Sequence, residues 1–167
     1  MSALAHLETI VLGPLTGRPE ADWQRAPAGK WTPAQIVEHL AISMNSSAAK
    51  FEQRRGYAPM QRRARGVVGF VARAAILGLR WFPRGFTAPE RTQPAPAIPR
   101  APAEAHFRDG LTHWAALERD LLPARPRDVF VKHPRLGDLT LAEWIRFHDV
   151  HARHHARQIR ERLGGAP

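Results

Sequence analysis

Cysteine is absent from the 167-residue chain, which excludes disulfide bonds, thiolate metal ligands and a cysteine nucleophile. Long apolar runs are also lacking. The most apolar stretch, residues 66–82, is interrupted by Arg73 and Arg80, and it falls short of the ~20 apolar residues that a membrane-spanning helix needs. Alternating runs rich in Val, Ile and Thr are nearly missing too, apart from Val129-Phe130-Val131. The sequence therefore predicts a soluble, all-α protein.

The N-terminal stretch lacks the layout of a secretory signal. No Lys or Arg precedes the apolar residues of Met1–Gly17, and Glu8 lies among them. We therefore expect a cytoplasmic protein. With 44% apolar residues, the chain is long enough for one compact domain, residues 1–167, and too short for two.

Positive charge is abundant and unevenly distributed. The formal net charge is +10, and residues 50–100 hold eleven basic residues against two acidic ones, so nearly the whole excess lies in this middle segment. Such localisation disfavours a protein that coats nucleic acid, and no nucleic-acid recognition motif accompanies the charge. We do not expect nucleic acid to be a partner.

Helix start and stop signals divide the chain into four core helices and an insertion. Thr32, Pro33 and Gln35 form a capping box with proline at the first helical position, and Thr140 with Glu143 forms a second box. The expected core helices cover residues 2–12, 32–55, 102–122 and 140–163. Residues 56–100 form the expected insertion, with a helical middle over 62–81 and a proline-rich arm over 83–102. The sequence thus predicts a four-helix bundle with a basic, Pro-rich helical insertion between the second and third core helices.

Histidines are concentrated in the last predicted helix, where four of the nine fall between residues 148 and 155. At 100° per residue, His148, His151 and His155 share one inward stripe with apolar side chains, whereas His154 is expected to face solvent. An apolar face with three imidazoles must either hydrogen-bond them or use them to bind something. No aspartate or glutamate lies on this stripe to pair with them, so the pattern favours a divalent metal ion.

Another helix must supply the remaining ligand. His39, just after the capped start of the second helix, is the best candidate, and the alternative for it is a simple hydrogen bond to a backbone carbonyl. His148, one turn from His151, is the candidate for a catalytic proton shuttle. The alternative for His148 is a buried polar spacer without a chemical role.

The two histidine-bearing segments together resemble a known superfamily. Trp31–Leu40 (WTPAQIVEHL) and His151–Ile159 (HARHHARQI) are similar to the motifs of the DinB/YfiT-like superfamily, over about residues 20–55 and 130–163. The resemblance implies a four-helix bundle in which His39, His151 and His155 hold one divalent metal ion. The segment His133–Gly137 and Trp144 look like an uncharacterised branch of the superfamily. The arginine that many members carry directly after the second histidine stands one position later here, at Arg157.

Three neutral imidazoles leave coordination positions open, which is typical of catalytic sites, and a nitrogen donor set suits zinc or nickel. Two chemistries follow. A metal-bound water acting as hydroxide would make the protein a hydrolase. A low-molecular-weight thiol cosubstrate bound as thiolate would make it an S-transferase acting on an electrophilic small molecule. The resemblance favours S-transfer, because characterised superfamily members include thiol S-transferases and thiol-dependent isomerases.

The basic insertion suggests partners and a third, non-enzymatic alternative. Its arginines share one side of a predicted helix over 62–84, and apolar residues occupy much of the other side; these arginines are Arg62, Arg65, Arg73, Arg80 and Arg84. We expect the apolar side to pack on the bundle or on a second copy in a homodimer, with the arginines in solvent. The alternatives are a membrane-surface or protein-interaction module, or a basic lip that attracts an anionic substrate to the metal cleft.

Overall fold

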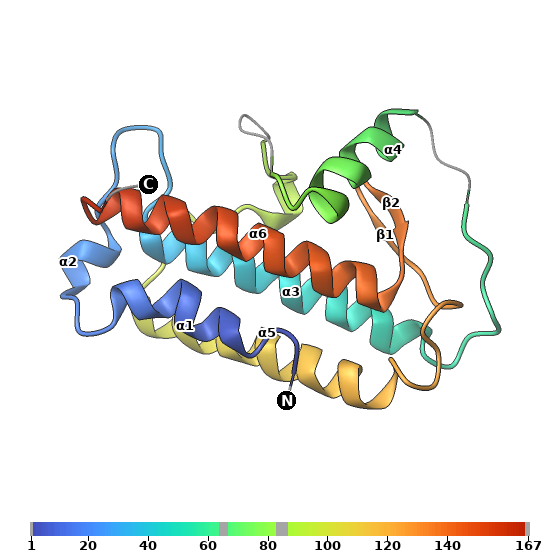
Figure 1. Cartoon of the computed structure of the whole chain (residues 1–167). Helices are drawn as coiled ribbons and strands as arrows, with labels where there is room; N and C mark the ends of the chain where they lie inside the picture. The colour runs from blue at the N-terminus through green and yellow to red at the C-terminus, as the bar shows by residue number, and fades with distance from the viewer. Residues whose placement is uncertain (1, 64–66, 83–86, 166–167) are drawn as a thin grey trace.

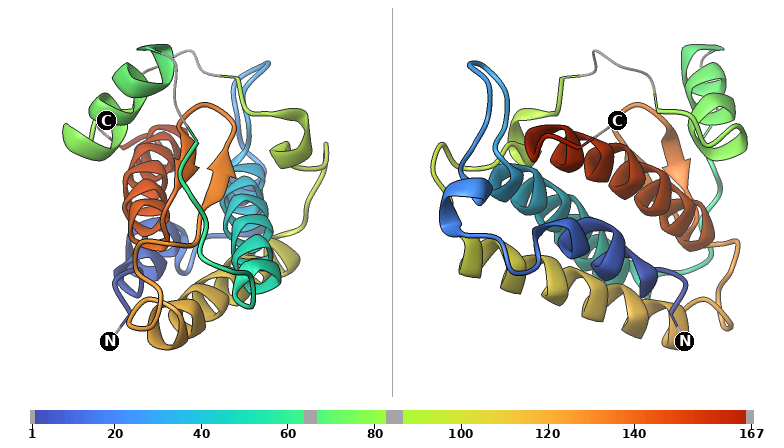
Figure 2. Two further views of the ribbon diagram at one scale, coloured as in Figure 1. Left: turned by 90° about the vertical axis from the view of Figure 1, so that its right-hand side faces the viewer. Right: turned by 60° about the vertical axis from the view of Figure 1, so that its left-hand side comes forward.

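The computed structural model describes residues 2–63, 67–82 and 87–165. Its main body is a bundle of four helices, which lie side by side along most of their lengths (Figures 1 and 2). They are α1 (His6–Leu12), α3 (Pro33–Arg54), α5 (Arg100–Asp120) and α6 (Leu141–Arg162). The predicted all-α class and four-helix bundle are therefore confirmed. A short helix that the sequence did not predict, α2 (Glu20–Trp23), joins α1 to α3.

Both predicted capping boxes are present, and each begins a helix that carries histidines. The Thr32 hydroxyl accepts a hydrogen bond from the backbone N–H of Gln35 at 3.2 Å, and the Gln35 side chain accepts one from the backbone N–H of Thr32 at 3.0 Å. Thr140 and Glu143 make the same pair of bonds at 3.3 and 2.9 Å. Because these caps fix where α3 and α6 start, they also fix which of their residues face inward.

Helix α5 packs closely against α3, and a glycine permits this approach. A Cβ atom at Gly110 would lie 3.1 Å from the Cβ of Met44 and 3.3 Å from Nδ2 of Asn45. The indole of Trp114, four residues later, donates to the Met44 carbonyl at 3.1 Å. This contact fixes the position of α3 against α5.

The insertion between α3 and α5 is present, but its helix is shorter than the predicted 62–81. Helix α4 covers Val67–Arg73 and continues as a π-helical turn over Ala74–Gly78. Arg62 precedes the helix, and two of the five predicted stripe arginines, Arg65 and Arg84, lie outside the described residues. A 3₁₀ turn, Glu90–Thr92, follows before α5 begins.

Helix α4 has the reverse orientation of the one expected. Arg62 and Arg73 both form ion pairs with Glu143 of α6, so these arginines lie against the bundle. Five large apolar side chains of the α4 region are instead 59–79% exposed, namely Val67 (79%), Phe70 (67%), Val71 (60%), Leu79 (79%) and Trp81 (59%). Ile76 and Leu77, in the π-helical turn that follows, are buried in the core. The prediction of solvated arginines was therefore wrong for Arg62 and Arg73, because Glu143, fixed by its capping role, offers them a carboxylate, whereas Arg80 is 66% exposed.

A two-stranded antiparallel hairpin was not predicted. Strands β1 (Val131–His133) and β2 (Gly137–Leu139) pair with Lys132 opposite Asp138, and the hairpin lies between α3 and α6 at one end of the bundle (Figure 2). Three-residue strands are too short to show a period-2 pattern. Gly137, with φ of 74°, adopts the left-handed conformation that ends the turn.

No helix within the described ranges has the length and the apolar character needed to cross a membrane.

Candidate metal centre

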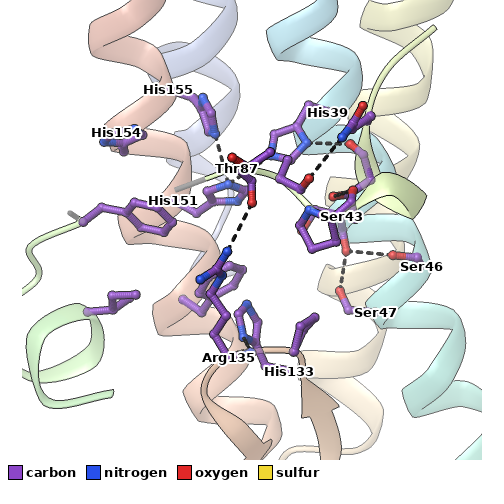
Figure 3. Close-up of a pocket in the computed structure, with 18 of the residues that line it drawn as sticks. His39, Ser43, Ser46, Ser47, Thr87, His133, Arg135, His151, His154 and His155 are labelled. Atoms are coloured by element: carbon purple, nitrogen blue, oxygen red, sulfur yellow. Dashed lines mark hydrogen bonds between the residues drawn. The ribbon is translucent and has the colours of Figure 1, made fainter. Parts of the chain in front are cut away.

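Three of the predicted site residues meet in the core. His39 comes from α3, and His151 and His155 come from successive turns of α6 (Figure 3). The Nε2 atom of His151 lies 3.2 Å from Nε2 of His39 and 3.0 Å from Nε2 of His155. One ring nitrogen from each residue falls within 4.8 Å of the others, and all three side chains are buried. We call this group the histidine cluster.

Hydrogen bonds on the far side of two rings fix their tautomers. Nδ1 of His39 lies 2.6 Å from the carbonyl oxygen of Thr92, which can only accept, so Nδ1 carries the proton. Nδ1 of His155 likewise donates to Oε1 of Gln158 at 2.8 Å. A neutral imidazole has a single N–H, so the Nε2 atoms of both rings present lone pairs to the centre. Metal-binding histidines typically donate their other ring N–H to an oxygen atom in this way.

The remaining ring shows that the cluster is incomplete by itself. Nδ1 of His151 is buried and has no hydrogen-bond partner among the described residues. A proton on Nε2 of His151 can serve one neighbouring nitrogen, and the other lone pair then stays unsatisfied at about 3 Å. A cation at the centre would satisfy all three nitrogens together. The unmet lone pairs are therefore a feature that a bound metal ion explains.

Protonation of the histidines does not supply the positive charge at the centre of the cluster. Burial lowers the pKa of His151 and of His155 well below the ordinary value of 6.5, and neighbouring imidazoles, that of His39 among them, lower both further. Burial also lowers the pKa of His39, although its bond to Thr92 opposes the shift. The three rings are neutral near pH 7, which is the protonation state that a metal requires of its histidine ligands.

The spacing fits a divalent ion. Nitrogen ligands 2.0–2.1 Å from a tetrahedral zinc lie about 3.3–3.4 Å apart. The two Nε2–Nε2 distances from His151, 3.0 and 3.2 Å, lie within a few tenths of an ångström of this value. The all-nitrogen donor set suits zinc, nickel and related metals.

Aromatic rings hold the imidazoles in place. Trp31 lies 4.9 Å from His39 and 6.4 Å from His155, measured between ring centroids. Phe82 and Phe147 stack on His151 at 5.4 and 5.0 Å. Such contacts restrict the rotation of each ring and make the surroundings apolar. The cluster is thus rigid and partly shielded from water.

One side of the cluster opens into a cavity of about 1230 Å³. Its walls come from α3, α6, the hairpin and the insertion, and the cluster histidines lie on its surface (Figure 3). His154 also lines this cavity, where its ring centroid lies 4.9 Å from that of Phe82 and its Nε2 is 3.1 Å from Nε2 of Gln158. The expectation that His154 faces solvent was therefore wrong. The arm around Phe82 covers the side of α6 that an isolated helix would expose.

His148 lies behind the cluster and outside the cavity lining. It is 1% exposed, and its Nε2 forms a hydrogen bond with Oγ of Ser47 at 3.0 Å. Trp114 and Trp144 pack against its ring at 4.8 and 5.4 Å. Its link to the cavity runs through Ser47, which lines the cavity wall. A catalytic role for His148 stays a prediction.

Several cavity residues were not singled out as site residues from sequence. They are Ser43, Lys50, Arg91, Thr92, His133 and Arg135. His133 and Arg135 stood in the segment that resembles one branch of the superfamily, so a signal for them existed. Arg91 and Thr92 lie in the proline-rich arm, whose composition indicates only irregular chain.

Comparison with known proteins agrees with this picture. A family model described as a protein of unknown function (DUF1569) matches residues 19–162. YfiT from Bacillus subtilis, described as a probable metal-dependent hydrolase with an unusual four-helix bundle topology, has a similar solved structure. The two chains are 18% identical, the match covers 98% of this chain and 85% of that chain, and the TM-score is 0.61. At this identity the likeness shows the fold alone. No curated protein matches the chain.

Proposed function

The chain belongs to the family described as DUF1569 and has the DinB/YfiT-like fold, and from this premise we propose that it is a metal-dependent enzyme. His39, His151 and His155 would hold one divalent ion, zinc or nickel. The observation that carries the proposal is the convergence of three buried, neutral imidazoles whose lone pairs face one another within 4.8 Å. An open cavity beside them gives a small molecule access.

When bound, the ion would supply Lewis acidity, which lowers the pKa of water or of a thiol and polarises an electrophile. The protein contributes orientation. The Thr92 carbonyl and the Gln158 amide keep the protons of His39 and His155 on Nδ1, so that both Nε2 atoms stay available. Phe82 and Phe147 keep the ring of His151 in its plane and limit the water around it.

We favour hydrolysis as the reaction, because the structurally similar YfiT is described as a probable metal-dependent hydrolase. Thiol S-transfer, which the resemblance implies, is the second candidate. One observation supports it: a cavity of about 1230 Å³ exceeds the ~300–1,000 Å³ of a typical single-ligand pocket, so a thiol cosubstrate and an electrophile fit together. Turnover that needs an added thiol would select S-transfer, and turnover in water alone would select hydrolysis.

Metal titration tests the site itself. We expect the chelator-stripped protein to bind about one equivalent of Zn²⁺ or Ni²⁺ tightly, and His151→Ala to abolish this binding. The matched control is His113→Ala, because His113 lies on the exposed face of α5 outside the cavity. The absence of stoichiometric binding in wild type, or equal binding by His151→Ala, would refute the proposal.

The exposed apolar face of α4 supports a separate, non-enzymatic proposal. Val67, Phe70, Val71 and Leu79 are each at least 60% exposed, with the cation of Arg80 nearby in sequence and 66% exposed. An apolar face beside basic residues suits the surface of an anionic membrane. We expect flotation with anionic vesicles at low salt, and its loss in Phe70→Glu. Absence of flotation rules this contact out, and a dimer in solution would then account for the face.

A further inference from the structure

Resting on the proposed function, we propose that the substrate is anionic and that one oxyanion group of it binds between Lys50, Arg91 and His133, in the same cavity as the histidine cluster. We call these three residues the anion subsite. Carboxylate and phosphate are the two groups that this chemistry would take.

The cavity is strongly basic. Seven basic side chains line it and one acidic side chain, Glu161, does so; the basic ones are Lys30, Lys50, Arg91, Lys132, Arg135, Arg157 and Arg162. Glu161 lies 3.7 Å from Arg162 and is thereby engaged by one of these cations. Charges of one sign on the walls of a cleft focus their field into it and attract ions of the opposite sign.

Lys50, Arg91 and His133 all line this cavity, and the charge of Arg91 acts on both of the other side chains. Burial, Arg91 and Arg54 together lower the pKa of Lys50. Burial, Arg91 and Arg135 lower the pKa of His133 to about 3. Lys50 comes from α3, Arg91 from the 3₁₀ turn and His133 from β1, so three separate elements bring these groups to one place.

Within the part of the chain that the structure describes, no carboxylate pairs with the cations of the anion subsite. Among the described residues, neither Lys50 nor Arg91 lies within ion-pair distance of an acidic side chain. Clustered cations that lack a protein counter-charge and line a cavity are arranged as for an anionic ligand.

His133 contributes a hydrogen-bond donor. Its Nδ1 accepts from the backbone N–H groups of Arg135 and Leu136 at 3.2 and 3.1 Å, so the neutral ring carries its proton on Nε2. Because protonation of this ring is suppressed, His133 remains a fixed neutral donor near pH 7. Ser43 and Ser46 add hydroxyl groups to the same wall (Figure 3).

The anion subsite and the histidine cluster share one short segment. Arg91 and Thr92 are consecutive in the turn Glu90–Thr92, and the carbonyl of Thr92 holds Nδ1 of His39 at 2.6 Å. An anion bound at Arg91 would therefore also steady the turn that orients a cluster histidine. A substrate anchored here by its oxyanion has its remaining atoms beside the cluster.

Calorimetric titration of the full chain, stripped of metal and at low ionic strength, tests the anion subsite without the metal. Inorganic phosphate is one probe and succinate is the other. We expect at least one of them to bind, and Lys50→Gln and Arg91→Gln each to raise its Kd about tenfold, since a charge-assisted hydrogen bond is lost. The matched control, Arg119→Gln, removes the same charge from α5, which lines no part of the cavity, and should leave Kd within about twofold.

Binding of phosphate alone would support a phosphorylated substrate, and binding of succinate alone a carboxylic one. The proposal is overturned if neither anion binds, or if Arg119→Gln weakens binding as much as the two cavity variants do. The metal titration described above stands apart from this test. Metal binding without anion binding would refute the anion subsite only, and anion binding without metal binding would refute the proposed function only.

Discussion

Substitution of Gln158 tests whether its hydrogen bond to His155 keeps Nε2 of that ring available to bind a metal ion. Its Oε1 accepts the Nδ1 proton of His155 at 2.8 Å, and its Nε2 lies 3.1 Å from Nε2 of His154. Gln158→Leu keeps a similar volume and removes both interactions. Without the acceptor, His155 gains by moving its proton to Nε2, where it can donate to Nε2 of His151 at 3.0 Å. That tautomer hides the lone pair that would bind the metal.

The expected cost follows from these contacts. Loss of a partner that orients a metal-binding histidine typically lowers metal affinity 10–100-fold, which corresponds to about 1.4–2.7 kcal/mol. The metal-free protein should change less, by about 1 kcal/mol, because the tautomer switch replaces the lost hydrogen bond with a new one. Gln158→Glu should keep or increase affinity, since a carboxylate accepts the same proton and makes the ring more basic.

Competition of each variant with a chelating dye for Zn²⁺ gives the affinities, and urea unfolding of the metal-free proteins gives the stabilities. A Gln158→Leu protein that binds Zn²⁺ as tightly as wild type, while His151→Ala binds none, would refute the orienting role. Equal losses in metal affinity and in metal-free stability would show that the substitution acts on folding and not on the tautomer.

Three other predictions concern stability. Gly110→Ala should lower the free energy of unfolding by about 1 kcal/mol, because overpacking against Met44 at 3.1 Å outweighs the gain in helix propensity. Urea unfolding measures this loss. The control is Gly78→Ala, whose added Cβ meets nothing within 4 Å and which should cause no such loss. Thr140→Ala should cost about 1 kcal/mol through loss of the cap, and an unchanged midpoint in thermal unfolding would contradict this. Burial lowers the pKa of His148 to about 3, so below pH 6.5 the unfolded chain binds a proton that the folded one does not. The free energy of unfolding of metal-free protein should therefore fall with acid, by up to about 1.4 kcal/mol per pH unit for this residue; His148→Leu should flatten the slope, and a slope equal to that of wild type would contradict the assignment.

The features of the fold that could be predicted were those encoded within a few residues. The capping boxes at Thr32 and Thr140 depend on side chains three positions apart, and both are present. The inward stripe of α6 depends on helical phase, and its members His148, His151 and His155 are all buried. The short hairpin was missed because three-residue strands carry too little pattern, and they pair only where α3 and α6 leave room between them.

The site could be predicted only in part. The alternatives considered for His39, metal ligand or hydrogen bond to a carbonyl, prove compatible, because Nδ1 bonds Thr92 while Nε2 faces the cluster. The orientation of α4 was predicted wrongly, because helical phase separates arginines from apolar side chains and does not say which side meets the bundle. Glu143, fixed in a distant cap, decides that side through its ion pairs with Arg62 and Arg73.

Local sequence was enough to predict the four core helices, the capped starts of α3 and α6 and the inward face that carries the histidines, because capping and helical periodicity act over one or two turns of chain. It also placed the excess of positive charge in one segment. That several of these basic side chains line the cavity beside the histidine cluster follows from the tertiary structure alone. Lys50, Arg91 and His133 are 41 or more residues apart in sequence, and they meet because the arm and the hairpin fold back over α3 and α6. Such meetings depend on packing between elements, which no local pattern encodes.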